Sequence, residues 1–113
     1  MDNNQDIYEL RIYTVKPELY TNLIGLWENE GKPIIEKHMN CIGIWSSESG
    51  DLNKIFHLYY WKNYEEREIA RHDFYNDINA KEYVKKVKPC YQKQESYILK
   101  SLKFFEALNK EKI

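Results

Sequence analysis

The chain has 113 residues, of which 42% are hydrophobic and 31% charged, and its formal net charge is −1. This length suits one domain, and the hydrophobic fraction excludes a disordered polypeptide. Lysines and glutamates are intermixed without a basic cluster, so we expect no nucleic acid as a partner.

The cysteines and the first residues of the chain favour a cytoplasmic protein. Cys41 and Cys90 are far apart and lack the spacing of a zinc site or a redox dithiol, so we expect free thiols and no metal. Residues 1–6 are polar and acidic, unlike a signal peptide, and no apolar stretch is long enough to span a membrane. We expect a disordered segment at 1–6, one folded domain at 7–103 and a C-terminal tail at 104–113.

The first part of the domain is predicted to be a strand followed by a helix. Side chains alternate over residues 7–15, as in a strand. Pro17 suits the first position of a helix, and an apolar residue at every fourth position over 19–27 forms one stripe. Gly31 and Pro33 interrupt this stripe, so we expect the helix to end before them and one short turn to follow.

A β-hairpin is predicted in the middle of the chain. Residues 41–47 and 55–61 alternate as strands do, and the polar sequence at 47–51 between them has turn chemistry. Gly50 lies within that turn, where glycine permits the positive φ that a tight hairpin needs.

A second helix and a final strand follow the hairpin. Asn63 is a good helix cap, and Glu66 three residues later can reach back as in a capping box. The apolar pattern continues to Pro89, with a kink expected at 76–79, and residues 91–100 alternate as a strand. After this strand, the chain is expected to pack through Leu102, Phe104 and Phe105.

The order strand, helix, hairpin, helix, strand predicts an α+β domain of the ferredoxin-like βαββαβ kind. Such a domain has a four-stranded antiparallel sheet with both helices on one side. We expect Tyr8, Leu10 and Ile12 to face the helices. The uncovered face of the sheet then carries polar and aromatic residues, and a second copy of the chain is the simplest cover for it.

Six residues expected on that uncovered face are the candidate ligand site. An arginine and a carboxylate in a half-buried cavity would fix the polar end of a small molecule, while aromatic rings would cover its apolar body. Alternatively, Glu9 and Arg11 form an ion pair that sets the register of the dimer. The six residues are Glu9, Arg11, Tyr13, Trp45, His57 and Tyr59.

His57 is the main candidate for proton transfer, with Tyr59 as the other candidate catalytic residue. The ordinary pKa of histidine lies where proton transfer at neutral pH is feasible. The alternative is a hydrogen-bonded histidine at the dimer interface. Arg67 and Arg71, one helical turn apart, are expected on a solvated face paired with nearby carboxylates rather than in an anion site.

Five segments of the chain resemble the NIPSNAP family. They occur in matching order across residues 7–100, at 8–17, 42–45, 50–53, 57–61 and 94–99. The resemblance implies a dimeric α/β barrel, in which two ferredoxin-like sheets face each other, and implies no particular catalytic residues. Animal members have been linked to vesicle traffic and mitochondrial quality control.

Three functional hypotheses follow. The first is a homodimer that binds a small apolar or aromatic ligand with a polar head in the cavity between the sheets, without a cofactor. The second is an enzyme similar to the cofactor-free monooxygenases and cyclases of the dimeric α/β barrel superfamily. The third is a protein-interaction module related to vesicle traffic. A closed, wet, polar cavity in the dimer favours the first two, whereas a cavity filled by Trp45 and the tyrosines favours the third.

Overall fold

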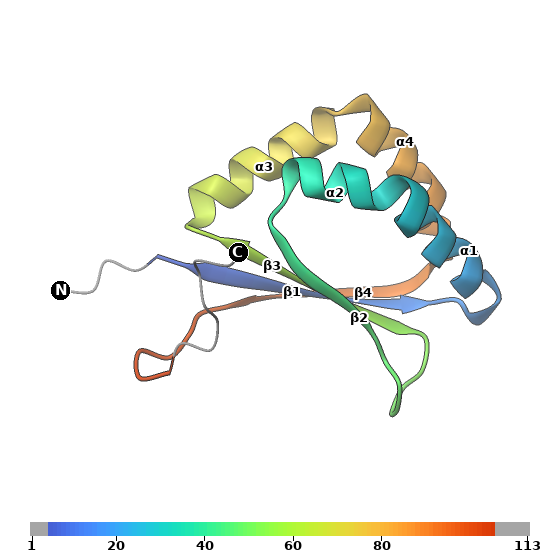
Figure 1. Ribbon diagram of the computed structural model, residues 1–113, viewed down its shortest axis with the longest axis horizontal. Coiled ribbons are helices and arrows are strands. Elements are labelled where there is room, and N and C mark those ends of the chain that lie inside the picture. The colour runs from blue at the N-terminus through green and yellow to red at the C-terminus, as the bar shows by residue number, and fades with distance from the viewer. Residues whose placement is uncertain (1–4, 106–113) are drawn as a thin grey trace.

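A four-stranded antiparallel sheet carries all the helices on one of its faces (Figure 1). The computed structural model describes residues 5–105, so most of the expected segments at 1–6 and 104–113 lies outside the described residues. The strands have the order β2-β3-β1-β4, which confirms the expected ferredoxin-like fold. They are β1 (Ile7–Val15), β2 (Cys41–Ser46), β3 (Lys54–Trp61) and β4 (Tyr91–Leu99).

The first helical segment is continuous, contrary to the expected interruption near Gly31 and Pro33. A 3-10 turn and three helical pieces follow one another without a gap. The second of the three helical pieces is a π turn, in which the backbone N–H of Lys32 donates to the carbonyl of Trp27, five residues earlier. Proline has no N–H to give to an α-helical ladder, and a π turn just before it tolerates that loss. The pieces are Pro17–Leu19, α1 (Tyr20–Leu26), the π turn Trp27–Gly31 and α2 (Lys32–His38).

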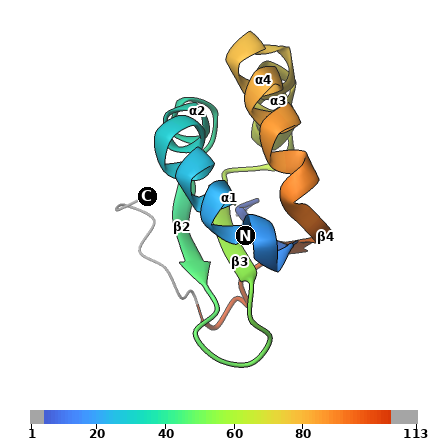
Figure 2. The same cartoon turned by 90° about the vertical axis from the view of Figure 1, so that its right-hand side faces the viewer.

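Gly31 has a packing role instead of ending the helix. A Cβ atom at this position would lie 2.5 Å from the hydroxyl oxygen of Tyr83 and 2.8 Å from its Cζ. Tyr83 belongs to α4 (Ile78–Val87) and is buried, so its ring has little room to withdraw. The two helical segments therefore approach each other closely at Gly31, and Figure 2 shows them side by side over the same face of the sheet.

The second helical segment is divided at Asp77, which confirms the expected kink. Asp77 has an extended backbone between α3 (Tyr64–Asn76) and α4, and its side chain accepts a hydrogen bond from the backbone N–H of Asn79. The same side chain pairs with His38 Nε2 at 2.7 Å and so connects the break to the end of α2. The kink is thus both a helix start and a contact between segments.

The start of α3 is capped as expected. The side-chain oxygen of Asn63 accepts a hydrogen bond from the backbone N–H of Glu66 at 2.7 Å. The carboxylate of Glu66 in turn accepts from the backbone N–H of Lys62, one residue before the cap, at 2.7 Å. These two bonds satisfy donors that a helix start would otherwise leave unpaired.

The hairpin between β2 and β3 forms as predicted, with a φ of 77° at Gly50. A register shift between Cys41 and Gly43 marks a bulge in β2. After this bulge Trp45 pairs with Phe56, an even-numbered residue of β3. The bulge therefore decides which face of the sheet Trp45 shares.

The face of the sheet that meets the helices is the opposite of the one expected. The odd-numbered residues of β3 are buried, and the ring of Tyr13 on β1 lies against Trp27 with the ring centroids 5.8 Å apart. Tyr8, Leu10 and Ile12 therefore point away from the helices. Strand alternation fits either orientation, and here the large aromatic and polar side chains occupy the layer between sheet and helices.

The uncovered face of the sheet is consequently apolar. Trp45, Tyr97 and Leu99 are exposed on it, while Phe56 and Leu10, opposite the first two, are partly buried, and Tyr8, opposite Leu99, is buried. The expected packing of the tail is wrong for its described part, because the side chains of Leu102 and the two phenylalanines are exposed. Lys54, Lys93 and Glu95 lie at one end of this face, and its apolar part, called the open sheet face below, is formed by Leu10, Ile12, Trp45, Phe56, Leu58, Tyr97 and Leu99.

The covered face contains two hydrophobic clusters. One surrounds Val15, Leu23 and Val87, and the other surrounds Ile7 and Trp61. Tyr-rich space lies between them, as described below. Among residues 5–105, no helix is long and apolar enough to cross a membrane.

Replacing Gly31 by alanine should lower the free energy of unfolding by about 1–3 kcal/mol, because the added methyl group meets the buried ring of Tyr83. The matched control is Gly25→Ala in α1, where a Cβ has no neighbour within 4 Å. The control should raise the free energy of unfolding by up to about 1 kcal/mol through helix propensity. Chemical denaturation measures both, and equal behaviour of the two variants would contradict the packing role of Gly31.

Candidate functional site

A cavity of about 300 Å³ lies between the sheet and the helices. It separates the two hydrophobic clusters, since Tyr13 and Trp27 from one cluster and Tyr59 from the other line it. Its wall is rich in tyrosine, with Tyr75 at the exposed end of α3 and Tyr83 on α4. The cavity therefore has an aromatic lining and lies inside one chain.

Four of the six predicted site residues meet in this cavity. Arg11, Tyr13, His57 and Tyr59 line it together. The expectation that they face a second sheet is wrong, because they lie on the face that the helices cover. Trp45 lies on the opposite face of the sheet with 52% of its surface exposed, and so does not join them.

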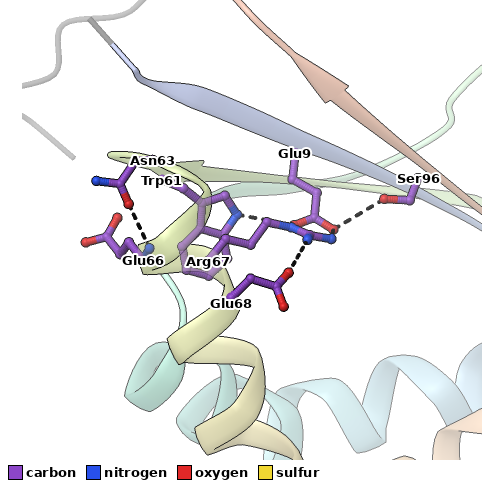
Figure 3. Close-up of polar contacts among 7 residues, drawn as sticks. All are labelled: Glu9, Trp61, Asn63, Glu66, Arg67, Glu68 and Ser96. Atoms are coloured by element: carbon purple, nitrogen blue, oxygen red, sulfur yellow. Dashed lines mark hydrogen bonds and ion pairs between the residues drawn. The ribbon is translucent and has the colours of Figure 1, made fainter. Parts of the chain in front are cut away.

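Glu9, which is 2% exposed, has its carboxylate held by residues other than Arg11 (Figure 3). Arg67 on α3 donates to it from Nε at 2.9 Å and from Nη2 at 3.3 Å. Trp61 Nε1 donates at 3.2 Å, and the hydroxyl of Ser96 on β4 donates at 3.3 Å. The expected Glu9–Arg11 pair is thus replaced by an ion pair that ties α3 to three strands.

Arg67 was expected on a solvated face, and that expectation is only half right. It does contact the exposed carboxylate of Glu68, at 3.2 Å. Its side chain is nevertheless only 17% exposed, because it turns inward to Glu9. The two partners are 58 residues apart in sequence, so no local spacing indicated the pair.

The pKa of Glu9 reflects this network. Burial acts to raise the pKa, but the hydrogen bonds and positive charge of Arg67, with help from Arg11 and Trp61, outweigh burial. The pKa of Glu9 is therefore below its ordinary value, and the side chain is ionised at neutral pH.

Arg11 is left without an anionic partner. Within residues 5–105 its guanidinium forms no ion pair, and its Nε is buried without a hydrogen-bond partner. The nearest specific contact is with the ring of Tyr13, whose centroid is 5.5 Å from the guanidinium carbon. Because a guanidinium stays protonated in proteins, the cavity wall carries a positive charge that attracts the nearby carboxylate of Glu9 but forms no ion pair with any carboxylate of the described chain.

Two further cations lie at or next to the cavity lining. Arg71 lies over the ring of Tyr75, with 5.4 Å between the guanidinium carbon and the ring centroid, and Lys88 lines the cavity. No aspartate or glutamate in the described part of the chain lines it. The site is therefore electrostatically suited to an anion rather than a cation.

His57 is 2% exposed and lies between aromatic rings. The centroids of Tyr13 and Trp27 are each 4.8 Å from that of the imidazole. Its Nδ1 is 2.8 Å from the hydroxyl oxygen of Tyr59, whereas its Nε2 is buried and has no hydrogen-bond partner within residues 5–105. Burial and the charge of Arg11 lower the pKa of His57 to about 3, so the imidazole is neutral at pH 7.

Three buried tyrosines of the cavity stay protonated as well. Burial raises the pKa of Tyr59 well above its ordinary value, and it raises those of Tyr83 and Tyr91 too. Tyr83 and Tyr91, with Trp27 and Tyr75, were missed as site residues by sequence reasoning. Tyr83 belonged to an apolar helix stripe, and the only available signal was the unusual number of tyrosines, ten in the chain.

Replacing Arg67 by methionine should lower the free energy of unfolding by about 3 kcal/mol at pH 7, because Glu9 then keeps a buried charge with fewer partners. The folded-state pKa of Glu9 is depressed in the parent, so its contribution is present above the ordinary glutamate pKa and is lost as pH falls through the folded-state pKa. The loss of Arg67 raises that pKa.

The difference in unfolding free energy between parent and Arg67→Met should consequently shrink as the pH falls from about 7 to about 4. Denaturant titrations across this pH range measure it. Glu9→Gln added to Arg67→Met should recover part of the stability at pH 7. A difference that stays constant with pH would contradict the ionic role of Glu9.

Comparisons with known proteins agree with this fold. The sequence profile of the NIPSNAP family matches residues 8–106. A NIPSNAP-like domain protein from Burkholderia xenovorans is 26% identical, with a TM-score of 0.85 over 95% of this chain and 94% of its own. A NIPSNAP family protein from Agrobacterium tumefaciens is 23% identical, with a TM-score of 0.86 over 95% and 97%. No curated protein matches the chain.

A more distant structure shares the fold alone. It is described as "Putative antibiotic biosynthesis monooxygenase" from Nitrosomonas europaea, is 9% identical, and covers 91% of this chain and 96% of its own with a TM-score of 0.67. At this identity the likeness carries no residue from one site to the other. The family match, by contrast, extends over most of the chain, and the chain therefore belongs to the NIPSNAP family.

Proposed function

We propose that this protein is a homodimer that binds a small aromatic or apolar molecule with a polar head in the cavity between sheet and helices. The observation that carries the proposal is the guanidinium of Arg11, which lies in the cavity wall without a carboxylate partner in the described chain. The Arg11 side chain is partly buried and its Nε is fully so. Leaving such a charge without a hydrogen-bonded partner is unfavourable, and an anionic ligand head would provide one.

The remaining walls fit the body of such a ligand. Tyr13, Trp27 and Tyr91 present rings to the cavity, and rings bury large apolar area while keeping a defined geometry. A volume of about 300 Å³ lies at the lower end of the range for ligand pockets, so one or two rings are a suitable size. The ligand site lies within each chain, and not between two sheets as the sequence led us to expect.

The homodimer is proposed from the open sheet face. A contiguous apolar patch of this kind usually marks an interface, and two such faces are complementary under twofold symmetry. We further propose a cytoplasmic location, supported by the free thiols of Cys41 and Cys90, since reducing compartments keep thiols in this state.

The other two hypotheses have weaker support. A neutral His57 whose pKa is about 3 accepts a proton poorly at pH 7, which weighs against its use as a general base. The interaction hypothesis relied on a filled cavity and on the tail after Phe105. The cavity described above lies within one chain and not between two sheets, and that tail lies outside the described residues.

The ligand proposal predicts that Arg11→Met lowers the affinity for small aromatic carboxylates by about tenfold or more, because methionine keeps part of the stem's packing and removes the charge. Isothermal titration calorimetry with benzoate and phenylacetate measures it. Lys85→Met is the matched control, since Lys85 is an exposed cation on α4 that pairs only with Glu82 in the described chain. Equal loss in both variants, or no binding to the parent, would contradict the proposal.

The dimer proposal predicts a particle of twice the 13.8 kDa chain mass in sedimentation equilibrium at micromolar concentration. Tyr97→Lys places a charge on the open sheet face and should shift the dissociation constant upward by about tenfold or more. Ile69→Lys is the control, because Ile69 is equally exposed but lies on α3. A parent protein that stays monomeric at this concentration would contradict the proposed homodimer.

A further inference from the structure

The direction of the His57–Tyr59 hydrogen bond depends on the tautomer of the imidazole. The Tyr59 hydroxyl is buried, stays protonated, and within residues 5–105 makes no second hydrogen bond. If it accepts from Nδ1–H, its own hydrogen is buried without an acceptor. If it donates to Nδ1, the ring hydrogen is on Nε2, which is likewise buried without a partner in the described chain. A ligand acceptor at Nε2 gives every hydrogen a partner only in the second case, with the hydroxyl donating to Nδ1.

The cavity wall then holds two unused N–H donors and no matching acceptor. They are Nε–H of Arg11 and Nε2–H of His57, both buried without a partner in the described chain. The groups that face His57 are Arg11 and Tyr13 from β1, Tyr59 from its own strand and Trp27 from the π turn. None of them supplies an anion, so the unmet need at this point is for an oxygen with negative charge.

We propose that His57 is a neutral hydrogen-bond donor that, together with Arg11, selects ligands bearing a carboxylate, and that Tyr59 is the positioning residue that fixes the His57 tautomer. This inference rests on the proposed function and names its ligand class. A carboxylate has only acceptors, so it can satisfy both donors, whereas a carboxamide of the same shape brings an NH₂ group toward Arg11.

Solvent does not reach either nitrogen in the ligand-free protein. The rings around them therefore have to separate slightly when a ligand enters, and no ordered water has to leave these two donors. Hydrogen bonds to a charged group in such a dry setting are stronger than those in water. This is the physical basis for a preference for the anion over its neutral analogue.

The tautomer is tested on the free protein by long-range ¹H–¹⁵N NMR of the histidine rings. His57 should carry its proton on Nε2, with Nδ1 unprotonated, from about pH 5.5 to about pH 8. Tyr59→Phe should change this pattern, because the donor to Nδ1 is gone. Tyr64→Phe, an exposed tyrosine on α3, should leave it unchanged. A proton on Nδ1 in the parent, or an unchanged pattern in Tyr59→Phe, would overturn the assignment.

The donor role is tested by calorimetric titration with benzoate and benzamide. The parent should bind benzoate more tightly than benzamide by about tenfold or more. His57→Leu should lose most of this preference while packing in the same place. His57→Gln, whose amide N–H can replace Nε2–H, should keep most of it.

The outcomes separate the two proposals. Binding of benzoate to the parent with the preference unchanged in His57→Leu overturns the inference and leaves the ligand site standing. Binding of benzamide to the parent as tightly as benzoate also overturns the inference and leaves the ligand site standing. If the parent binds neither probe, both the proposed function and the proposed ligand class are wrong. This holds whichever tautomer of His57 the NMR measurement finds.

Discussion

Two arginines compete for one buried carboxylate, and the outcome decides the chemistry of the layer between sheet and helices. Arg67 reaches Glu9 from α3 with two N–H donors, while Trp61 and Ser96 complete its coordination. The carboxylate is thereby fully used, and the helix is tied to the sheet. Arg11, two residues from Glu9 on the same strand face, keeps its charge without a partner in the described chain. The structural ion pair and the candidate binding site are thus consequences of the same arrangement.

The cavity persists because rigid groups hold its walls apart. The π turn at Trp27–Gly31 aligns Trp27 with His57, and the missing side chain of Gly31 lets Tyr83 approach the first helical segment. Asp77 divides the second segment and binds His38, which fixes α3 and α4 relative to α2. Aromatic rings line the remaining space, and rings cannot collapse into it as flexible aliphatic chains could. The result is a small cavity whose wall includes the guanidinium of Arg11.

The sequence predicted the order of elements well because its signals are local. Alternation over 7–15, the Asn63 cap and the kink at 76–79 all depend on neighbours within a few residues. It failed where partners are distant. Alternation shows that two faces differ but not which one the helices cover, so Tyr13 and Tyr59 were assigned to the wrong side. The partner of Glu9 is 58 residues away, and the contact that explains Gly31 lies on another helix. Arg11, Tyr13, His57 and Tyr59 nevertheless lie together in one cavity, because they share one strand parity.

The central claim is that the uncompensated charge of Arg11 marks the place where an anionic ligand head binds. A crystal structure of the protein with 4-iodobenzoate tests it most directly, because the anomalous signal of iodine locates the ring independently of other density. The account predicts an iodine peak inside the cavity between β1, β3 and the helices, with the carboxylate within hydrogen-bond distance of Arg11. An iodine peak only on the open sheet face or at surface lysines, with the cavity empty, would contradict it.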